Sequence, residues 1–134
     1  MNFFKSIIVS FFVIYFYNKF VLKFSVVNKE KIFLIEFLAP LIEESTKTTM
    51  AIIFNTPILL THVGIGVIEA IRDYIFLRSL GGALSSLAGH TFFGFITVLV
   101  YIVTDYLIIG IGVSVLAHIS WNFFIIKVSQ TKNS

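Results

Sequence analysis

The fold is decided by the stretch 85–127, which reads SSLAGHTFFGFITVLVYIVTDYLIIGIGVSVLAHISWNFFIIK. Its only charged residue before Lys127 is Asp105, which separates two apolar runs, 85–104 and 106–127. A helix needs roughly 20 mostly apolar residues to cross a bilayer. Each run is therefore predicted to be one membrane span, and the two spans are joined by a very short connection.

Three further apolar segments precede this pair, and they are 3–22, 32–55 and 57–78. The first has no small-residue cleavage site, so it is expected to remain as a span. Asn55, Thr56 and Pro57 predict a turn before the third segment, because proline suits a first helical turn. Gly81 and Gly82 are expected to break the chain before residue 85. The result is an all-α transmembrane bundle of about five helices, forming a single domain over 1–134.

Composition agrees with this fold class. Of 134 residues, 57% are hydrophobic and only 13% are charged, with a mean hydropathy of +0.97, whereas soluble domains are about one-quarter charged. This favours a multi-pass protein of the cell membrane in contact with lipid. The absence of cysteine excludes disulfides, thiolate zinc sites and cysteine nucleophiles. A net charge of +3 without a basic stripe argues against nucleic acid as a partner.

Ionisable side chains recur inside the predicted spans. Each costs on the order of 3 kcal/mol at mid-bilayer, so such groups are rare and usually meet partners inside the bundle. At 1.5 Å per residue, Glu43 and Glu69 reach similar depths from opposite sides. His90, His118 and Asn122 lie at depths that allow them to meet the two carboxylates. The sequence therefore predicts one buried polar cluster.

Local spacing refines this cluster. The side chains of Glu43 and Glu44 point about 100° apart around a helix axis, so both cannot aim at one point. One can act in catalysis while the other supports it. Lys47 is near enough in sequence to pair with either one, and spacing leaves the choice open. His118 and Asn122 are four residues apart and share a helix face.

These side chains suit peptide hydrolysis without a covalent intermediate. That reaction needs an activated water, a base for its proton and donors for the developing oxyanion. A buried glutamate can be the base, His90 can hold the water, and His118 with Asn122 can donate to the oxyanion. Two histidines with a glutamate also suit zinc or iron. No cofactor is required, and zinc stays open.

Four motifs, in this order along the chain, resemble those of a known family. They are Glu43-Glu44-Ser45-Thr46-Lys47, then Glu69, then His90-Thr-Phe-Phe-Gly94, then His118-Ile-Ser-Trp-Asn122. They look like those of PrsW-like peptidases, within the CAAX-processing and bacteriocin-processing superfamily of membrane proteases. The resemblance covers 41–123. It implies a glutamate-dependent intramembrane protease in which Glu43 and His90 activate water.

In the same resemblance His118 and Asn122 stabilise the oxyanion, and the supporting residues are Glu44, Lys47 and Glu69. The expected substrate is a membrane-associated or transmembrane protein, or a lipid-anchored peptide. An oligomer is left open.

Other interpretations remain. The carboxylates could form structural ion pairs, Glu69 could belong to a local charge cluster with Arg72 and Asp73, and His62 is expected at the membrane interface. A second function class is a small proton-coupled transporter using the same groups as a relay. A third is a noncatalytic scaffold or immunity-type protein that binds a partner helix.

Overall fold

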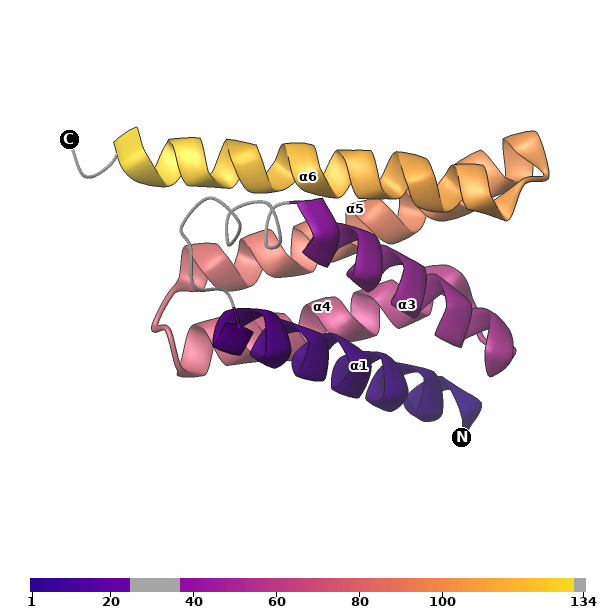
Figure 1. Cartoon of the computed structure of the whole chain (residues 1–134), viewed down its shortest axis with the longest axis horizontal. Helices are drawn as coiled ribbons and strands as arrows, with labels where there is room; N and C mark the ends of the chain where they lie inside the picture. The colour runs from indigo at the N-terminus through magenta and orange to yellow at the C-terminus, as the bar shows by residue number, and fades with distance from the viewer. Residues whose placement is uncertain (25–36, 132–134) are drawn as a thin grey trace.

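The computed structural model describes residues 1–24 and 37–131, and these residues form an all-α bundle of five helices (Figure 1). The helices are α1 (Asn2–Phe24), α3 (Ala39–Ile53), α4 (Ile58–Ile75), α5 (Leu80–Thr104) and α6 (Leu107–Thr131). The predicted fold class is thus confirmed. The first part of the predicted segment 32–55, residues 32–36, lies outside the described residues.

Two turns fall where the sequence predicted them. α3 is followed by Asn55, whose positive φ of 50° reverses the chain, and Pro57 is the N-cap of α4. α5 ends at Asp105, a left-handed C-cap with φ 59° whose backbone N–H bonds to the Tyr101 carbonyl. A short polar side chain tolerates this left-handed conformation better than a bulky one. The charge of Asp105 therefore lies at a helix end.

The start of α5 was predicted wrongly. The helix begins at Leu80 instead of residue 85, and Gly81 and Gly82 belong to its first turn. Ser79 is the N-cap, and its hydroxyl accepts a hydrogen bond from the Gly82 N–H at 2.9 Å. This cap satisfies a donor that a helix start leaves free, so two glycines do not prevent the helix from forming. The chain instead turns at Arg78, which has φ 52°.

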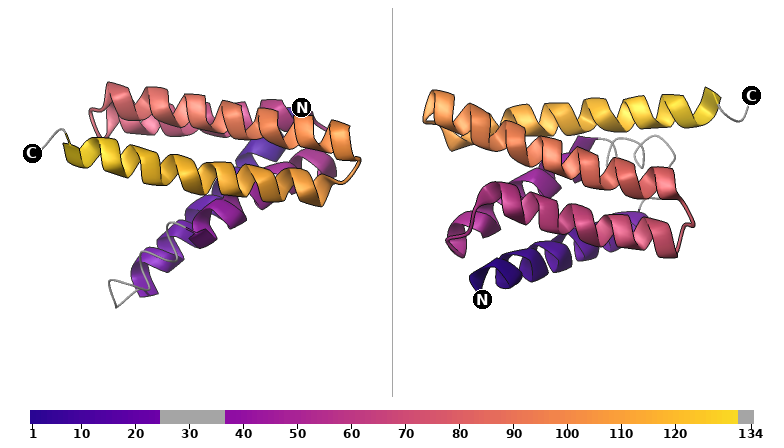
Figure 2. Two further views of the ribbon diagram at one scale, coloured as in Figure 1. Left: turned by 90° about the horizontal axis from the view of Figure 1, so that it is seen from above. Right: turned by 180° about the vertical axis from the view of Figure 1, so that it is seen from behind.

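α3 lies against three of the other helices. α4, α5 and α6 follow one another as antiparallel neighbours, while α3 packs against α1, α4 and α6 (Figure 2). Glycines allow the close approach of α4 and α5. A Cβ on Gly94 would lie 2.7 Å from the His62 Cβ, and one on Gly66 would lie 3.0 Å from the His90 Cβ. Small residues of this kind let membrane helices meet backbone to backbone.

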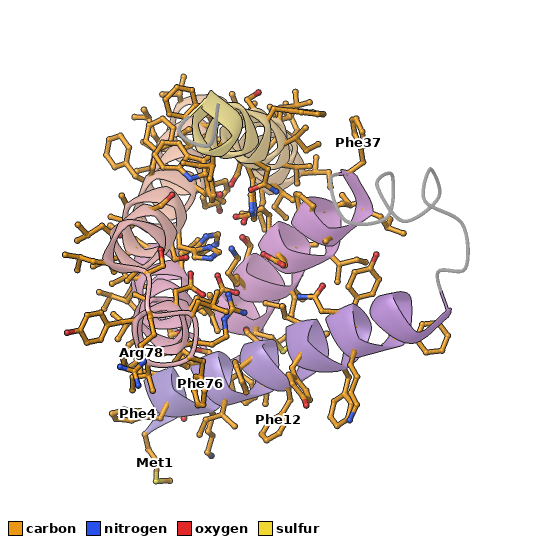
Figure 3. The ribbon with its side chains drawn as sticks, turned by 90° about the vertical axis from the view of Figure 1, so that its left-hand side faces the viewer. Met1, Phe4, Phe12, Phe37, Phe76 and Arg78 are labelled. Carbon is orange, nitrogen blue, oxygen red and sulfur yellow. The ribbon has the colours of Figure 1, made fainter. Side chains whose placement is uncertain are left out.

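Polar groups face the interior, and large apolar side chains face outward (Figure 3). Phe4, Phe12 and Phe76 lie on the outside, whereas nitrogen and oxygen atoms gather between α3, α4, α5 and α6. Among the described residues, 13 polar or charged residues are buried against 9 hydrophobic ones. A soluble core has the opposite preference, so this distribution indicates an apolar solvent around the bundle.

Three of the described helices are long and apolar enough to cross a membrane, namely Asn2–Phe20, Leu80–Thr104 and Leu107–Ile125. α3 has 15 described residues, which reach about 22 Å and fall short of a roughly 30 Å hydrocarbon core. α4 has Glu69, Arg72 and Asp73 within its 18 residues. That these two helices also span the membrane stays a prediction.

Candidate functional site

Glu44 of α3 is the centre of the buried polar cluster. Its Oε1 accepts hydrogen bonds from Lys47 Nζ at 2.5 Å and from His118 Nδ1 at 2.9 Å. Its Oε2 accepts one from Ser114 Oγ at 3.0 Å. The His62 Nδ1 atom lies 3.3 Å from the same oxygen, a close contact without hydrogen-bond geometry. Groups from α3, α4 and α6 therefore surround this carboxylate and compensate its charge.

A second branch leads from Lys47 to α5 and α4. Lys47 Nζ lies 2.9 Å from His90 Nδ1, and His90 Nε2 lies 2.6 Å from Glu69 Oε2. An ammonium group can only donate hydrogen bonds, so Nδ1 accepts and Nε2 holds the ring hydrogen that is donated to Glu69. This assignment makes His90 neutral and fixes its ring on both sides. The groups Glu44, Lys47, His90 and Glu69 thus form one continuous chain of contacts.

Glu43 differs from its neighbour. It is 9% exposed, and its carboxylate makes no hydrogen bond or ion pair with another described residue. Yet its oxygens lie within 4.8 Å of ligand atoms of Glu69 and His90 on one side, and of Glu44 and His118 on the other. Glu43 is therefore a carboxylate with unused acceptor capacity beside the hydrogen-bonded groups of the cluster.

These same groups make up two sets of possible metal ligands, Glu43 with Glu69 and His90, and Glu43 with Glu44 and His118. In the first set both ring nitrogens of His90 already have partners. In the second set both oxygens of Glu44 already accept hydrogen bonds. A divalent cation would also have to compete with the Lys47 ammonium, because that charge lies beside both sets. The present arrangement fits a bound water more directly than a metal.

Aromatic rings shield one side of the cluster. Phe93 is buried and stacks on the His118 ring with 4.4 Å between centroids. Trp121 meets the edge of Phe93 and donates from Nε1 to Ser85 Oγ at 3.3 Å. Such walls lower the local dielectric, which strengthens the electrostatic interactions inside.

The structure brings together six of the seven predicted site residues, namely Glu43, Glu44, Lys47, Glu69, His90 and His118. Lys47 pairs with Glu44, a choice of partner that the sequence spacing had left open. Asn122 is the exception. It is half-buried one turn beyond His118, and it makes no hydrogen bond with a described residue. It shares a helix face with His118 but takes no part in these contacts.

Two features depart from the other sequence interpretations. His62 is fully buried instead of interfacial, with Nε2 3.2 Å from Thr48 Oγ1. Its spacing of seven from Glu69 puts both on one face of α4, and this was the signal that could have revealed it. Glu69 does not form the local charge cluster either, because Arg72 pairs with Asp73 at 2.9 Å while Glu69 turns to His90.

Fold and site together define a helical protein with helices able to cross a membrane and a buried Glu–Lys–His centre. No protein-family model matches the chain, and neither the curated proteins nor the solved structures that were searched give a match.

Proposed function

We propose that the protein is an intramembrane endopeptidase of the glutamate type, a PrsW-like multi-pass protein of the cell membrane. The observation that supports this most is the contrast between two adjacent glutamates. Glu44 is saturated by Lys47, His118 and Ser114, whereas Glu43 has free acceptor capacity beside His90. A general base needs an unused lone pair within reach of water, and Glu43 meets this condition.

In this mechanism Glu43 takes a proton from water, and the resulting hydroxide attacks the carbonyl carbon of the scissile peptide bond. The C–N bond of the tetrahedral intermediate then breaks, and the proton held by Glu43 passes to the leaving amine. No other reactant is consumed. The products are a carboxylic acid and an amine, as for any peptide hydrolysis.

His90 can hydrogen-bond to this water once one of its two ring nitrogens has separated from its present partner. Lys47 is fully buried, whereas the Glu69 side chain is 18% exposed at the edge of the cluster, so Glu69 is the partner expected to move. The Nε2–H of His90 then turns from Glu69 to the water. Catalytic hydrogen bonds commonly form only when substrate binds.

His118 and Asn122 are assigned to the oxyanion. Glu44 accepts the Nδ1–H of His118 and so orients the ring, and Nε2 donates to the oxyanion when it also carries a hydrogen. The Asn122 amide lies one helical turn further along the same face, where its N–H groups can add a second donor. Each such donor is worth roughly 3 kcal/mol in a site shielded from water. The proposed substrate is a transmembrane protein or lipid-anchored peptide that enters from the bilayer.

The test compares Glu43→Gln with wild type in liposomes that contain a fluorogenic transmembrane peptide. Removing the base is expected to lower kcat by about 100-fold or more, while the melting temperature stays close to that of wild type because Glu43 makes no hydrogen bond with a described residue. Asp105→Asn is the matched control, since it removes a carboxylate at a helix end far from the site. Undiminished cleavage by Glu43→Gln would overturn the assignment.

Metal dependence is tested in the same assay with a chelator. Insensitivity is expected from a glutamate mechanism. If the chelator abolishes cleavage and added Zn²⁺ restores it, the two ligand sets that contain Glu43 would instead be assigned to a metal ion.

A second candidate is favoured by one observation, the unbroken contacts from Glu44 through Lys47 and His90 to Glu69. Chains of ionisable groups inside a membrane are typical of proton relays. Proton flux into liposomes with a trapped pH dye, abolished by His90→Phe and not accompanied by cleavage of any peptide, would support transport over hydrolysis.

A further inference from the structure

α1 presents a polar face to the rest of the bundle. Ser6 and Ser10 are one turn apart and fully buried, and Tyr17 follows two turns later on the same side. The Ser10 and Tyr17 hydroxyls are buried without a hydrogen-bond partner among the described residues. Buried hydroxyl groups are nearly always paired with protein or with ordered water. Two orphans on one helix face therefore point to a hydrated contact with α3 and α4, against which α1 packs.

One end of this face reaches the turn between α3 and α4. Ser6 Oγ lies 3.1 Å from Thr61 Oγ1, and Thr56 Oγ1 lies 3.3 Å from each of these oxygens. Thr56 is partly exposed and its neighbour Asn55 is exposed. The three hydroxyls thus connect the buried face to the surface at a helix end.

The other end lies toward the part of α3 that carries Glu43. α1 and α3 run in opposite directions (Figure 1), so the 11 residues from Ser6 to Tyr17 cover about 16 Å of the interface. Glu43 lies ten residues before the end of α3 at Ile53, about 15 Å along the helix axis, so Tyr17 and Glu43 lie toward the same end of the α1–α3 interface.

We propose that this hydroxyl seam, defined as Ser6, Ser10, Tyr17, Thr56 and Thr61, is a water path from the α3–α4 turn to Glu43. Water is the ligand that fits, because it donates and accepts and each orphan lacks one small polar partner. The apolar outer surface offers no such route. That this water is the one hydrolysed rests on the proposed function.

The path is tested by cysteine accessibility, since the chain has no cysteine of its own. Ser10→Cys is treated in liposomes with a small charged methanethiosulfonate reagent that does not cross lipid. Phe12→Cys is the matched control, because Phe12 is two residues away and faces outward. Thiols react as thiolates, which require water, so Ser10→Cys should react at least about tenfold faster than Phe12→Cys. Equal rates would overturn the water path.

A second variant separates this inference from the proposed function. Ser10→Val places methyl groups in the seam and is expected to lower kcat several-fold with KM unchanged, while Ser120→Val on the exposed side of α6 leaves both unchanged. Fast labelling of Ser10→Cys in a protein without peptidase activity would sustain the path and refute the peptidase. Peptide cleavage together with slow labelling of Ser10→Cys would sustain the peptidase and refute the water path.

Discussion

The charged centre around Glu44 and the hydroxyl seam along α1 are both polar and both buried, yet they are completed differently. Both oxygens of Glu44 have donors within 3.0 Å, whereas the Ser10 and Tyr17 hydroxyls have no hydrogen-bond partner in the described part of the chain. The cost of an unpaired group explains the difference, because an isolated charge is far more expensive to bury than a neutral hydroxyl. A charged site must be saturated by the protein, while hydroxyl groups can leave positions for water.

The largest effect that tests this contrast is expected from Lys47→Met. It leaves the Glu44 carboxylate without its cation and should destabilise the protein by about 3–5 kcal/mol. Unfolding of the purified protein in mixed micelles measures this change, with Lys5→Met at the exposed end of α1 as the control. Adding Glu44→Gln to Lys47→Met should recover part of the loss. A cost below about 1 kcal/mol for Lys47→Met would show that the centre does not depend on its ion pair.

Ser114→Ala comes next in size. The Ser114 hydroxyl contacts both Glu44 Oε2 and the Phe93 carbonyl, at 3.0 and 3.1 Å. Losing a hydrogen bond to a charged group should cost about 1.5–3 kcal/mol in the same unfolding measurement. Ser120→Ala on the same helix is the control, because its exposed hydroxyl bonds only to the Leu116 carbonyl. Equal costs for the two variants would remove Ser114 from the centre.

The smallest effects are expected inside the hydroxyl seam and distinguish its two kinds of serine. Ser6→Ala breaks hydrogen bonds to Thr61 and Thr56 and should cost about 1 kcal/mol. Ser10→Ala removes a hydroxyl with no partner among residues 1–24 and 37–131, and should change stability by about 0.5 kcal/mol or less. If Ser10→Ala proved as costly as Ser6→Ala in thermal unfolding, Ser10 would have a protein partner and the two regions would not differ in this way.

Much of the charged centre could be anticipated from spacing. Four-residue and seven-residue intervals define helix faces, so the convergence of Glu69, His90 and His118 was accessible from the sequence. The role of His62 was missed because its depth was judged from its position near the start of α4. In the structure Gly94 lets that part of α4 approach α5 closely enough to bury the ring. The start of α5 was missed because the Ser79 cap outweighs the glycines that follow it.

The sequence by itself determined the helical class, because runs of about 20 apolar residues have few other ways to satisfy their backbone in lipid. It also determined which polar residues share a helix face, since that depends only on 3.6 residues per turn. The tertiary structure alone decided that Lys47 pairs with Glu44 and leaves Glu43 unpaired, and that α1 contributes a polar seam. Those outcomes depend on how helices rotate and approach one another, and that is set by packing between segments far apart in the chain.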